Sequence, residues 1–163
     1  MPLRLLAVSG SLRAQSVNQD ILRYLQTLCD DSVSWDFYGE MERLPAFNPD
    51  ITDEPTAVAD WKSRVSGADG VVICSPEYVF AMPGALKNAL DWTVSGTVWE
   101  AKPVLPVTAS LSGEKAHESL LLVLRTLGAE ISEDLLIPSA RTAWTAQQET
   151  LKNLLGRFVS SLQ

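Results

Sequence analysis

One short apolar segment restricts the fold more than any other feature of this chain. Residues 70–75 read GVVICS, and their apolar side chains follow one another without alternating with polar ones. A continuous run of this kind indicates a strand buried on both faces, as in a parallel sheet covered by helices. Residues 3–9 and 102–109 have the same character. We therefore expect an α/β fold, with Cys74 as a small buried apolar residue.

The rest of the chain alternates between strand and helix patterns. Ser16 followed by Gln19 is a capping-box signature at a helix start, and Gly128 is typical of the residue that follows a helix end. Residues 39–55 contain three prolines and are expected to form an ordered loop. The expected strands are residues 3–9, 33–38, 70–75, 102–109 and part of 130–138, and the expected helices are residues 16–28, 56–66, 83–94, 114–127 and 145–162.

Alternation of strand and helix implies a parallel sheet with helices on both faces. Five strands in 163 residues suit one flavodoxin-like domain, residues 1–163, built as a three-layer sandwich with strand order 2-1-3-4-5. In such sheets the ligand lies at the carboxyl ends of the strands, where the strand order reverses. The loops after the first, third and fourth strands reach that edge, so we expect them to form the functional site.

The charge of the chain limits its partners. Lysine and arginine total 13 against 20 aspartates and glutamates, a net charge of −7. Such a surface repels phosphate backbones, which argues against nucleic acid, although a few backbone amides and one arginine can still bind a small phosphorylated ligand. No apolar run is long enough to span a membrane, and the first predicted strand leaves no room for a signal peptide before it. We expect a cytoplasmic protein without membrane or nucleic-acid partners.

Residues that often bind metals or carry catalysis are sparse. The two cysteines, Cys29 and Cys74, lack metal-ligand spacing and suggest no disulfide framework. His117, the single histidine, lies on a predicted helix beside Glu114 and Glu118 and is expected at the surface. No G-x-S-x-G elbow is present, which argues against a Ser-His-Asp hydrolase. We expect no metal site.

The loop after the first strand has the composition of a phosphate site. Residues 9–18 read SGSLRAQSVN and lead into a helix N-terminus, where unpaired N–H groups and the helix dipole favour an anion. Gly10 would permit a tight turn, and Arg13 would add a charge-assisted fork. The loop is neither a Walker loop nor a G-x-G-x-x-G motif. The alternative is an ordinary polar loop in which Ser16 only caps the helix.

The loop after the third strand carries a more specific pattern. Residues 75–92 read SPEYVFAMPGALKNALDW. They resemble the signature of the NADPH-dependent FMN reductase family, which includes chromate, quinone and azo-dye reductases: a Pro-Glu-Tyr-Asn turn, Pro-Gly, then Leu-Lys-Asn-Ala-Ile/Leu-Asp-Trp. The first loop resembles the family's Gly-Ser-x-Arg-x-x-Ser-x-Asn pattern. The matching residues are Gly10, Ser11, Arg13, Ser16, Asn18, Pro76, Glu77, Tyr78, Pro83, Gly84, Leu86, Lys87, Asn88, Ala89, Leu90, Asp91 and Trp92.

The resemblance implies an enzyme that binds FMN, takes hydride from NADPH or NADH, and reduces a small acceptor (a quinone, flavin, azo compound or chromate) by a ping-pong mechanism. FMN carries the chemistry, so no catalytic side chain is expected. In the family the first loop binds the FMN phosphate, the Pro-Glu-Tyr turn lines the flavin ring, and the helix beginning at Pro83 lies at a dimer interface, which implies a homodimer or homotetramer. The implied cofactor-binding residues are Ser9, Ser11, Arg13, Ser16, Val17, Asn18, Pro76, Glu77, Tyr78, Val79, Ser110, Ser112 and Gly113.

The chain departs from the family pattern in both of the later loops. Val79 stands where the family has an asparagine after the tyrosine, and Ala81 replaces a common serine. With Phe80 and Met82 nearby, these residues predict that the opening of the flavin site is more hydrophobic than is typical of the family. In the loop after the fourth strand, residues 114–115 (EK) stand where the family has glycines, which predicts an altered flavin pocket.

Two other functions are compatible with the sequence. A flavodoxin-like carrier would pass single electrons between proteins, and steady NAD(P)H oxidation with a quinone would argue against it. A flavin-free binding protein on the same scaffold would be colourless after purification. The acceptor and the choice between NADPH and NADH stay open. Trp92 and Trp99 fit either the core or an interface.

Overall fold

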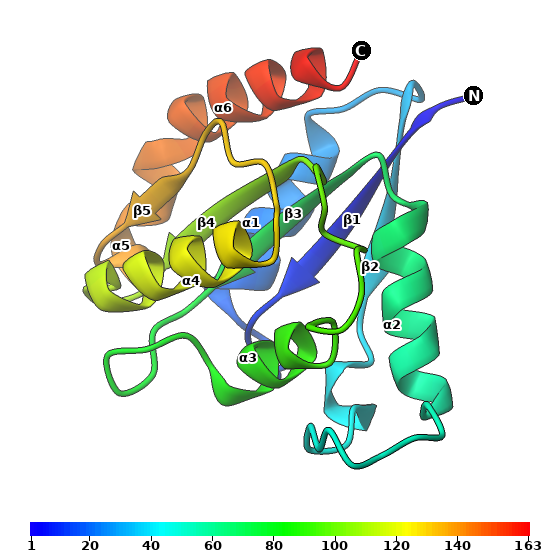
Figure 1. Cartoon of the computed structure of the whole chain (residues 1–163). Helices are drawn as coiled ribbons and strands as arrows, with labels where there is room; N and C mark the ends of the chain where they lie inside the picture. The colour runs from blue at the N-terminus through cyan, green and yellow to red at the C-terminus, as the bar shows by residue number, and fades with distance from the viewer.

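A computed structural model describes all residues, 1–163, and its centre is a sheet of five parallel strands (Figure 1). Their order across the sheet is β2-β1-β3-β4-β5. The predicted α/β class and the order 2-1-3-4-5 are therefore confirmed. The strands are β1 (Leu3–Ser9), β2 (Val33–Tyr38), β3 (Gly70–Ser75), β4 (Val104–Ala109) and β5 (Leu135–Ile137).

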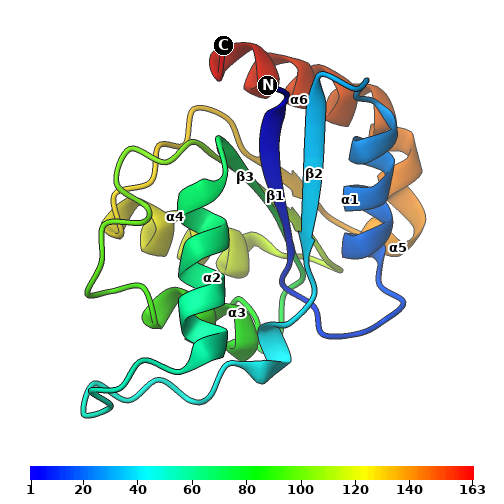
Figure 2. The same cartoon turned by 90° about the vertical axis from the view of Figure 1, so that its right-hand side faces the viewer.

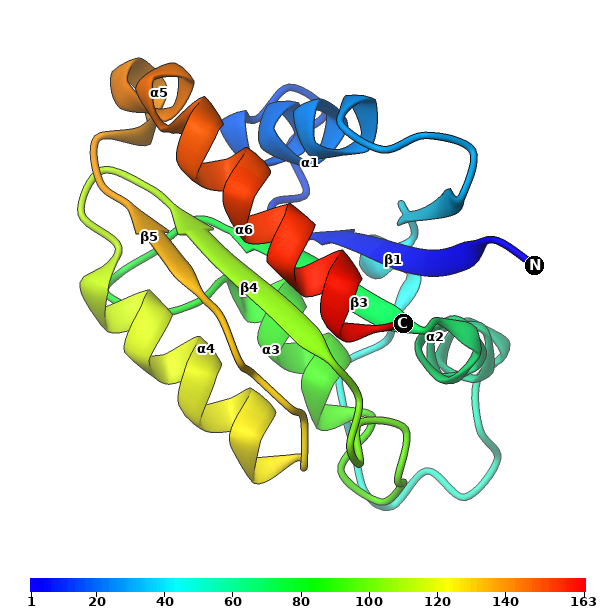
Figure 3. The same cartoon turned by 90° about the horizontal axis from the view of Figure 1, so that it is seen from above.

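Helices cover both faces of this sheet. Figures 2 and 3 show α1 and α6 on one face and α2, α3 and α4 on the other. None of the helices is both long enough and apolar enough to cross a membrane. The helices are α1 (Val17–Thr27), α2 (Thr56–Gly67), α3 (Gly84–Asp91), α4 (Glu114–Thr126), α5 (Ala140–Ala143) and α6 (Gln148–Ser161), with 3-10 helices η1 at Met41–Arg43 and η2 at Trp144–Gln147.

The two central strands explain the continuous apolar runs. Every residue of β3 and β4 is buried, because each strand packs against helices on both faces. One core cluster, under α2 to α4, contains Trp61 and Trp99. The other, under α1 and α6, contains Phe158 and the predicted buried Cys74. Full burial of a large apolar side chain contributes about 1.5–3 kcal/mol, so these clusters dominate the stability of the fold.

Local signals place two helix ends correctly. Ser16 is the N-cap of α1, and its hydroxyl accepts a hydrogen bond from the Gln19 N–H at 3.2 Å. Gln19 makes no return bond, so only half of the capping box forms. Gly128 follows the C-cap of α4 with φ +94°, the left-handed conformation that ends many helices.

The structure differs from the expected elements near the C-terminus and at the end of the third helix. The helix expected over 145–162 is the 3-10 helix η2 followed by α6, and the four-residue helix α5 precedes both. An element this short has no periodicity to reveal it. The fifth strand is only three residues long, and Glu130 forms an isolated bridge with Pro103 outside it. The third helix ends at Asp91, three residues before its expected end.

The Leu-Lys-Asn-Ala-Leu-Asp-Trp motif supports the long loop over residues 39–55. The Asn88 amide donates to the Pro45 carbonyl at 2.9 Å and accepts from the Phe47 N–H at 2.8 Å. The Trp92 indole donates to the same carbonyl at 2.7 Å, and its ring packs edge-on against Phe47. The motif therefore holds a proline-containing loop against α3.

Several residues expected at the surface or at an interface lie in the interior. Met82, predicted at the hydrophobic opening of the flavin site, is buried, and Trp92 and Trp99, which fitted either the core or an interface, are buried within one chain, whereas Phe80 is exposed. His117 was expected at the surface, and this expectation is wrong. Its position one turn before the buried Leu120 turns it toward the sheet. There its ring nitrogens pair with partners described below.

Candidate functional site

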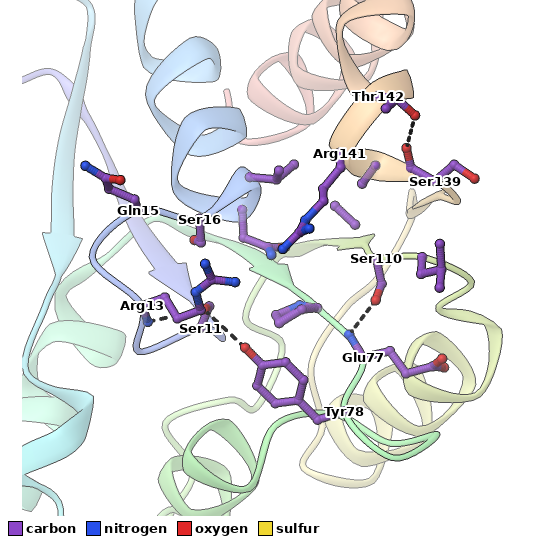
Figure 4. Close-up of a pocket in the computed structure, with 16 residues that line it drawn as sticks. Ser11, Arg13, Gln15, Ser16, Glu77, Tyr78, Ser110, Ser139, Arg141 and Thr142 are labelled. Carbon is purple, nitrogen blue, oxygen red and sulfur yellow. Dashed lines mark hydrogen bonds between the residues drawn. The ribbon is translucent and has the colours of Figure 1, made fainter.

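Four loops enclose a cleft at the carboxyl edge of the sheet. Its volume is about 580 Å³, within the range usual for cofactor sites. The loops follow β1, β3, β4 and β5, so the cleft lies where the strand order reverses. Figure 4 shows these walls around the opening. The lining residues are Ser11, Arg13, Gln15, Ser16, Val17, Asn18, Pro76, Glu77, Tyr78, Ala109, Ser110, Leu111, Ser139, Ala140, Arg141 and Thr142.

Gly10 lets the first loop cross directly over the end of β3. Its N–H donates to the Cys74 carbonyl at 2.9 Å. A Cβ at Gly10 would lie 2.5 Å from Ser75 Oγ and 2.9 Å from Ser75 Cβ, closer than packed atoms can approach. Its φ lies outside the left-handed region, so the glycine is required by this close approach and not by the tight turn expected from the sequence.

The N-terminus of α1 opens into the cleft with unpaired donors. The backbone N–H groups of Val17 and Asn18 have no acceptor within the protein. The first N–H groups of a helix lack intrahelical partners, and with the helix dipole they favour an anion. The Ser16 hydroxyl uses a lone pair for Gln19 and keeps its own proton available. This end of the cleft is therefore built to receive an anion.

Asn18 is oriented by a residue under the loop. Its Oδ1 accepts a hydrogen bond from Cys74 Sγ at 3.2 Å, which leaves the Nδ2 amide group without a partner in the protein. Burial raises the pKa of the Cys74 thiol, so the sulfur keeps the proton it donates. The cysteine is therefore apolar filling, as predicted, and also a hydrogen-bond donor that turns the Asn18 N–H₂ outward.

Ser9 and Ser11 shape the loop between them. Ser9 does not line the cleft, because its hydroxyl is bound to the backbone of Ser11 at 3.2 Å in both directions. The Ser11 hydroxyl accepts from the Arg13 N–H at 3.3 Å and lies 3.5 Å from the Tyr78 hydroxyl. The loops after β1 and β3 thus meet through Ser11 and Tyr78, as Figure 4 shows.

The turn after Tyr78 is tight and exposed. Tyr78 and Ala81 exchange two backbone hydrogen bonds of 2.9 and 3.1 Å, and Val79 and Phe80 between them have φ of +52° and +57°. Positive φ is costly for these residue types, and such strain collects at functional sites. Val79 is 96% exposed and Phe80 72% exposed. Val79 therefore points to solvent outside the cleft.

Glu77 lines the cleft with its backbone and sends its carboxylate elsewhere. Its N–H donates to Ser110 Oγ at 3.1 Å. The carboxylate accepts from the Ser112 hydroxyl at 2.8 Å and from the Ala116 N–H at 3.2 Å, at the start of α4. Desolvation acts to raise the pKa of Glu77, but these hydrogen bonds, with those of the Gly113 and Lys115 N–H groups, hold it below its usual value. Ser112 and Gly113 thus lie behind the cleft wall, at the cap of α4.

The fourth wall, after β5, was missed by the sequence analysis. Ser139 to Thr142 line the cleft there, and Gln15 joins them from the first loop. The available signal was topological, because the carboxyl end of a fifth parallel strand lies on the same edge as the other four. The Ser139 and Ala140 N–H groups donate to the Leu111 and Ser110 carbonyls, each at 2.9 Å, so this turn is tied to the loop after β4.

The electrostatics of the cleft favour a negative ligand. Its charged lining residues are Arg13, Arg141 and Glu77, and the carboxylate of Glu77 is occupied at α4. Neither arginine has a carboxylate within 4.0 Å. The two guanidinium groups, with the helix N-terminus of α1, make the cleft positive although the chain carries a net charge of −7.

His117 lies behind the cleft as a structural residue. One ring nitrogen, Nδ1, is 2.9 Å from Thr108 Oγ1, and the other, Nε2, is 2.8 Å from Asp134 Oδ1. The imidazole thus joins β4, α4 and the segment before β5. It does not line the cleft and has no free nitrogen to offer a ligand.

Comparisons with known proteins agree on one family. The family model described as NADPH-dependent FMN reductase matches residues 3–141. A 2-hydroxy-1,4-benzoquinone reductase from a Burkholderia species is 38% identical over 107 residues, which are 63% of this chain and 58% of that relative. A quinone reductase from Escherichia coli is 33% identical over 137 residues, 79% of this chain and 73% of the relative.

A solved structure shares the fold across nearly the whole chain. The flavoenzyme NAD(P)H:(acceptor) oxidoreductase FerB from Paracoccus denitrificans superposes with a TM-score of 0.81 at 24% identity. The match covers 98% of this chain and 97% of that one. At this identity the similarity establishes the flavodoxin-like fold.

Proposed function

The chain belongs to the NADPH-dependent FMN reductase family, an oxidoreductase family that uses FMN and NAD(P)H, and on this premise we propose that its 163 residues work as one FMN-binding reductase domain. It oxidises NADPH or NADH and reduces a small acceptor, with quinones, flavins, azo compounds and chromate as candidates. The observation that carries the proposal is the positive end of the cleft. There Val17 and Asn18, whose N–H groups are unpaired, line the same cleft as Arg13.

The residues of this end fit the phosphate of FMN. A phosphate monoester offers only acceptor oxygens, and the free groups here are donors: two backbone N–H groups, the Asn18 amide, the Ser16 hydroxyl and the Arg13 guanidinium. Gly10 keeps the loop close to β3, which leaves the space above it open. We therefore assign Ser11, Arg13, Ser16, Val17 and Asn18 to the phosphate, with Ser9 supporting Ser11.

The remaining walls fit the ring system. Pro76 and Tyr78 supply flat apolar surface, and Ser110 is held by the Glu77 N–H. When bound at these walls, FMN would supply the redox chemistry between NAD(P)H and the acceptor. The protein binds, orients and shields, since no histidine or free carboxylate lines the cleft as a general acid or base. One opening serves both substrates, which supports ping-pong kinetics.

The mouth of the cleft fits an apolar acceptor. Leu111 lines the cleft, and Leu12, Val79 and Phe80 lie within two residues of a lining residue along the chain; all four are more than half exposed. Exposed apolar groups gathered at one opening mark a binding or contact surface. This supports an aromatic acceptor such as a quinone over chromate, which is a hydrated anion.

The same apolar groups support self-association. A turn that projects Val79 and Phe80 into water is costly unless a partner covers it. A second copy of the chain is the simplest partner, since most oligomers are symmetric dimers or built from them. We therefore propose a homodimer or homotetramer. The two free cysteines suit a reducing compartment, and we propose the cytoplasm.

Reconstitution with FMN tests the function. The purified protein is incubated with excess FMN, desalted, and examined for a flavin spectrum with one FMN per chain. NADPH or NADH is then added with and without a quinone, and parallel double-reciprocal plots are expected for ping-pong turnover. A protein that stays colourless supports the flavin-free alternative, and flavin binding without NAD(P)H turnover supports the electron carrier.

A further inference from the structure

We propose that Arg141 is a second arm of the phosphate site, so that the phosphate is held between Arg13 from the loop after β1 and Arg141 from the helix after β5. The inference rests on the proposed function, because the phosphate in question is that of FMN. It adds a ligand from the wall that sequence motifs did not indicate. Figure 4 shows the Arg141 side chain extending from α5 into the cleft, toward the N-terminus of α1 where Ser16 and Arg13 lie.

The backbone that carries Arg141 is firmly held. Ala140, its neighbour, is 2% exposed and donates to the Ser110 carbonyl at 2.9 Å. Ser139 has φ +52° and ψ +35°, a left-handed conformation that is costly for a residue with a Cβ. The strained residue turns the chain out of β5 and directs α5 over the cleft. Because the backbone of this turn is already constrained, it loses little conformational freedom when Arg141 binds a ligand.

The arginine itself is free to bind. Arg141 is exposed, has no carboxylate within 4.0 Å, and donates no side-chain hydrogen bond in the protein. By contrast, Arg64 pairs with Asp36 and Asp60, and Arg157 pairs with Glu133. Arg141 and Arg13 are therefore the two cations of the cleft whose donors await an anion.

The charge of the ligand calls for both arginines. A phosphate monoester carries about −1.5 to −2 at pH 7. A helix N-terminus is equivalent to a charge of roughly +0.5. Together with one guanidinium, it supplies less positive charge than a full phosphate dianion requires. A second guanidinium completes the neutralisation. Planar guanidinium forks also suit phosphate oxygens, which lets two of them grip one group from opposite sides.

Flavin titrations of matched variants test the inference. Wild type, Arg141→Ala, Arg13→Ala and the double variant are titrated with FMN and with riboflavin, which lacks the phosphate, by quenching of flavin fluorescence. Arg141→Ala is expected to weaken FMN binding by about ten- to hundredfold and to leave riboflavin binding unchanged. Arg125→Ala removes the same charge from the exposed last turn of α4 and should change neither affinity. Arg141→Lys should recover part of the loss.

The double variant distinguishes one shared group from two separate ones. If both arginines bind one phosphate, the FMN loss in the double variant should differ from the product of the single losses by at least about threefold. An Arg141→Ala variant with unchanged FMN affinity and a raised KM for NADPH, but not NADH, would assign Arg141 to the co-substrate and overturn the inference. An equal loss for FMN and riboflavin would also overturn it, since Arg141 would then only support the turn. Wild-type protein that binds neither flavin would overturn the proposed function itself.

Discussion

Glu77 and Ser112 join the loops after β3 and β4, with 2.8 Å between the carboxylate Oε1 and the serine hydroxyl. The second carboxylate oxygen accepts from the Ala116 N–H at the start of α4. Gly113, the formal N-cap of this helix, has no side chain to bind those N–H groups. A residue 36 positions before it in the chain therefore does the capping. The Pro-Glu-Tyr turn after β3 thus contains a residue, Glu77, whose side chain stabilises a helix behind the cleft.

Glu77→Gln should destabilise the fold in a pH-dependent way. The variant loses the charge that the N-terminus of α4 favours, and we expect a cost of about 0.5–2 kcal/mol, as for other helix caps. Because the folded pKa of Glu77 lies below its usual 4.5, its contribution is fully present above that value and is lost as the pH falls through the folded pKa. Thermal unfolding at pH 7 and at decreasing pH measures the difference from wild type.

The control for Glu77 is Glu100→Gln, at an exposed glutamate whose carboxylate makes no hydrogen bond or ion pair. It should leave the stability at pH 7 unchanged within about 0.5 kcal/mol. A Glu77→Gln deficit that persists unchanged at pH 3 would mean that the ionised carboxylate contributes nothing to the cap.

Arg13→Ala should weaken FMN binding selectively. Loss of a charge-assisted hydrogen bond to the phosphate costs about 1.5–3 kcal/mol, or roughly ten- to hundredfold in Kd. Riboflavin lacks the phosphate, so its affinity should hardly change. The exposed side chain carries little packing, and the fold should survive. Titration of the wild type and the Arg13→Ala variant with FMN and with riboflavin measures this. An unchanged FMN affinity would make Arg13 a solvated loop residue.

Gly10→Ala should disturb both the fold and the cleft. The new methyl would lie 2.9 Å from Ser75 Cβ and 3.1 Å from Ser75 Cα, and only the hydroxyl at 2.5 Å can rotate away. The ends of β1 and β3 must therefore separate, at a cost of about 1–3 kcal/mol in unfolding free energy. FMN binding should weaken as well, because the loop moves. Denaturant unfolding and flavin titration measure the two effects.

Gly156→Ala is the matched control. Gly156 lies inside α6, and no atom is within 4 Å of a Cβ built there. Alanine is the better helix former, so this variant should gain about 0.5–1 kcal/mol. A Gly10→Ala variant as stable as wild type would show that the crossing over β3 tolerates a side chain.

His117→Leu should cost stability through the partner it leaves behind. Thr108 is fully buried, and His117 Nδ1 is the partner of its hydroxyl. An unpaired buried hydroxyl costs about 1–3 kcal/mol, while leucine roughly conserves the volume. Adding Thr108→Val removes the orphaned group and should recover much of the loss. Denaturant midpoints of the single and double variants measure this. A double variant less stable than the His117→Leu single variant would contradict the explanation.

Phe80→Ser should shift the assembly toward monomer. If a second copy covers the exposed turn, each dimer loses two buried phenyl groups, and the dissociation constant should rise by at least about tenfold. Leu122→Ser removes an apolar group that is 67% exposed on α4 and serves as the control. Light scattering at micromolar concentration measures both. A wild-type protein that is already monomeric there would exclude the proposed oligomer.

The sequence by itself determined the fold and indicated three of the four loops that enclose the cleft, those after β1, β3 and β4. Continuous apolar runs at residues 70–75 and 102–109 encode two-sided burial, and alternation with helices then leaves one reasonable sheet. Ser16 begins one helix and Gly128 follows the end of another, each through hydrogen bonds to residues only a few positions away. Such features depend on neighbours along the chain, so a single sequence carries them.

Tertiary structure alone decided the features in which distant segments meet. The Pro-Glu-Tyr turn was expected to line a flavin ring mostly through its backbone, but nothing in the sequence indicated that the Glu77 carboxylate caps α4 at Ala116, 39 residues further along the chain. His117 sits between Thr108 and Asp134 because α4 turns that face inward, although both flanking glutamates suggested the surface. Arg141 lines the cleft from α5, which follows the left-handed Ser139 at the end of β5. Each outcome depends on which loops the sheet brings together, and spacing along the chain does not encode that.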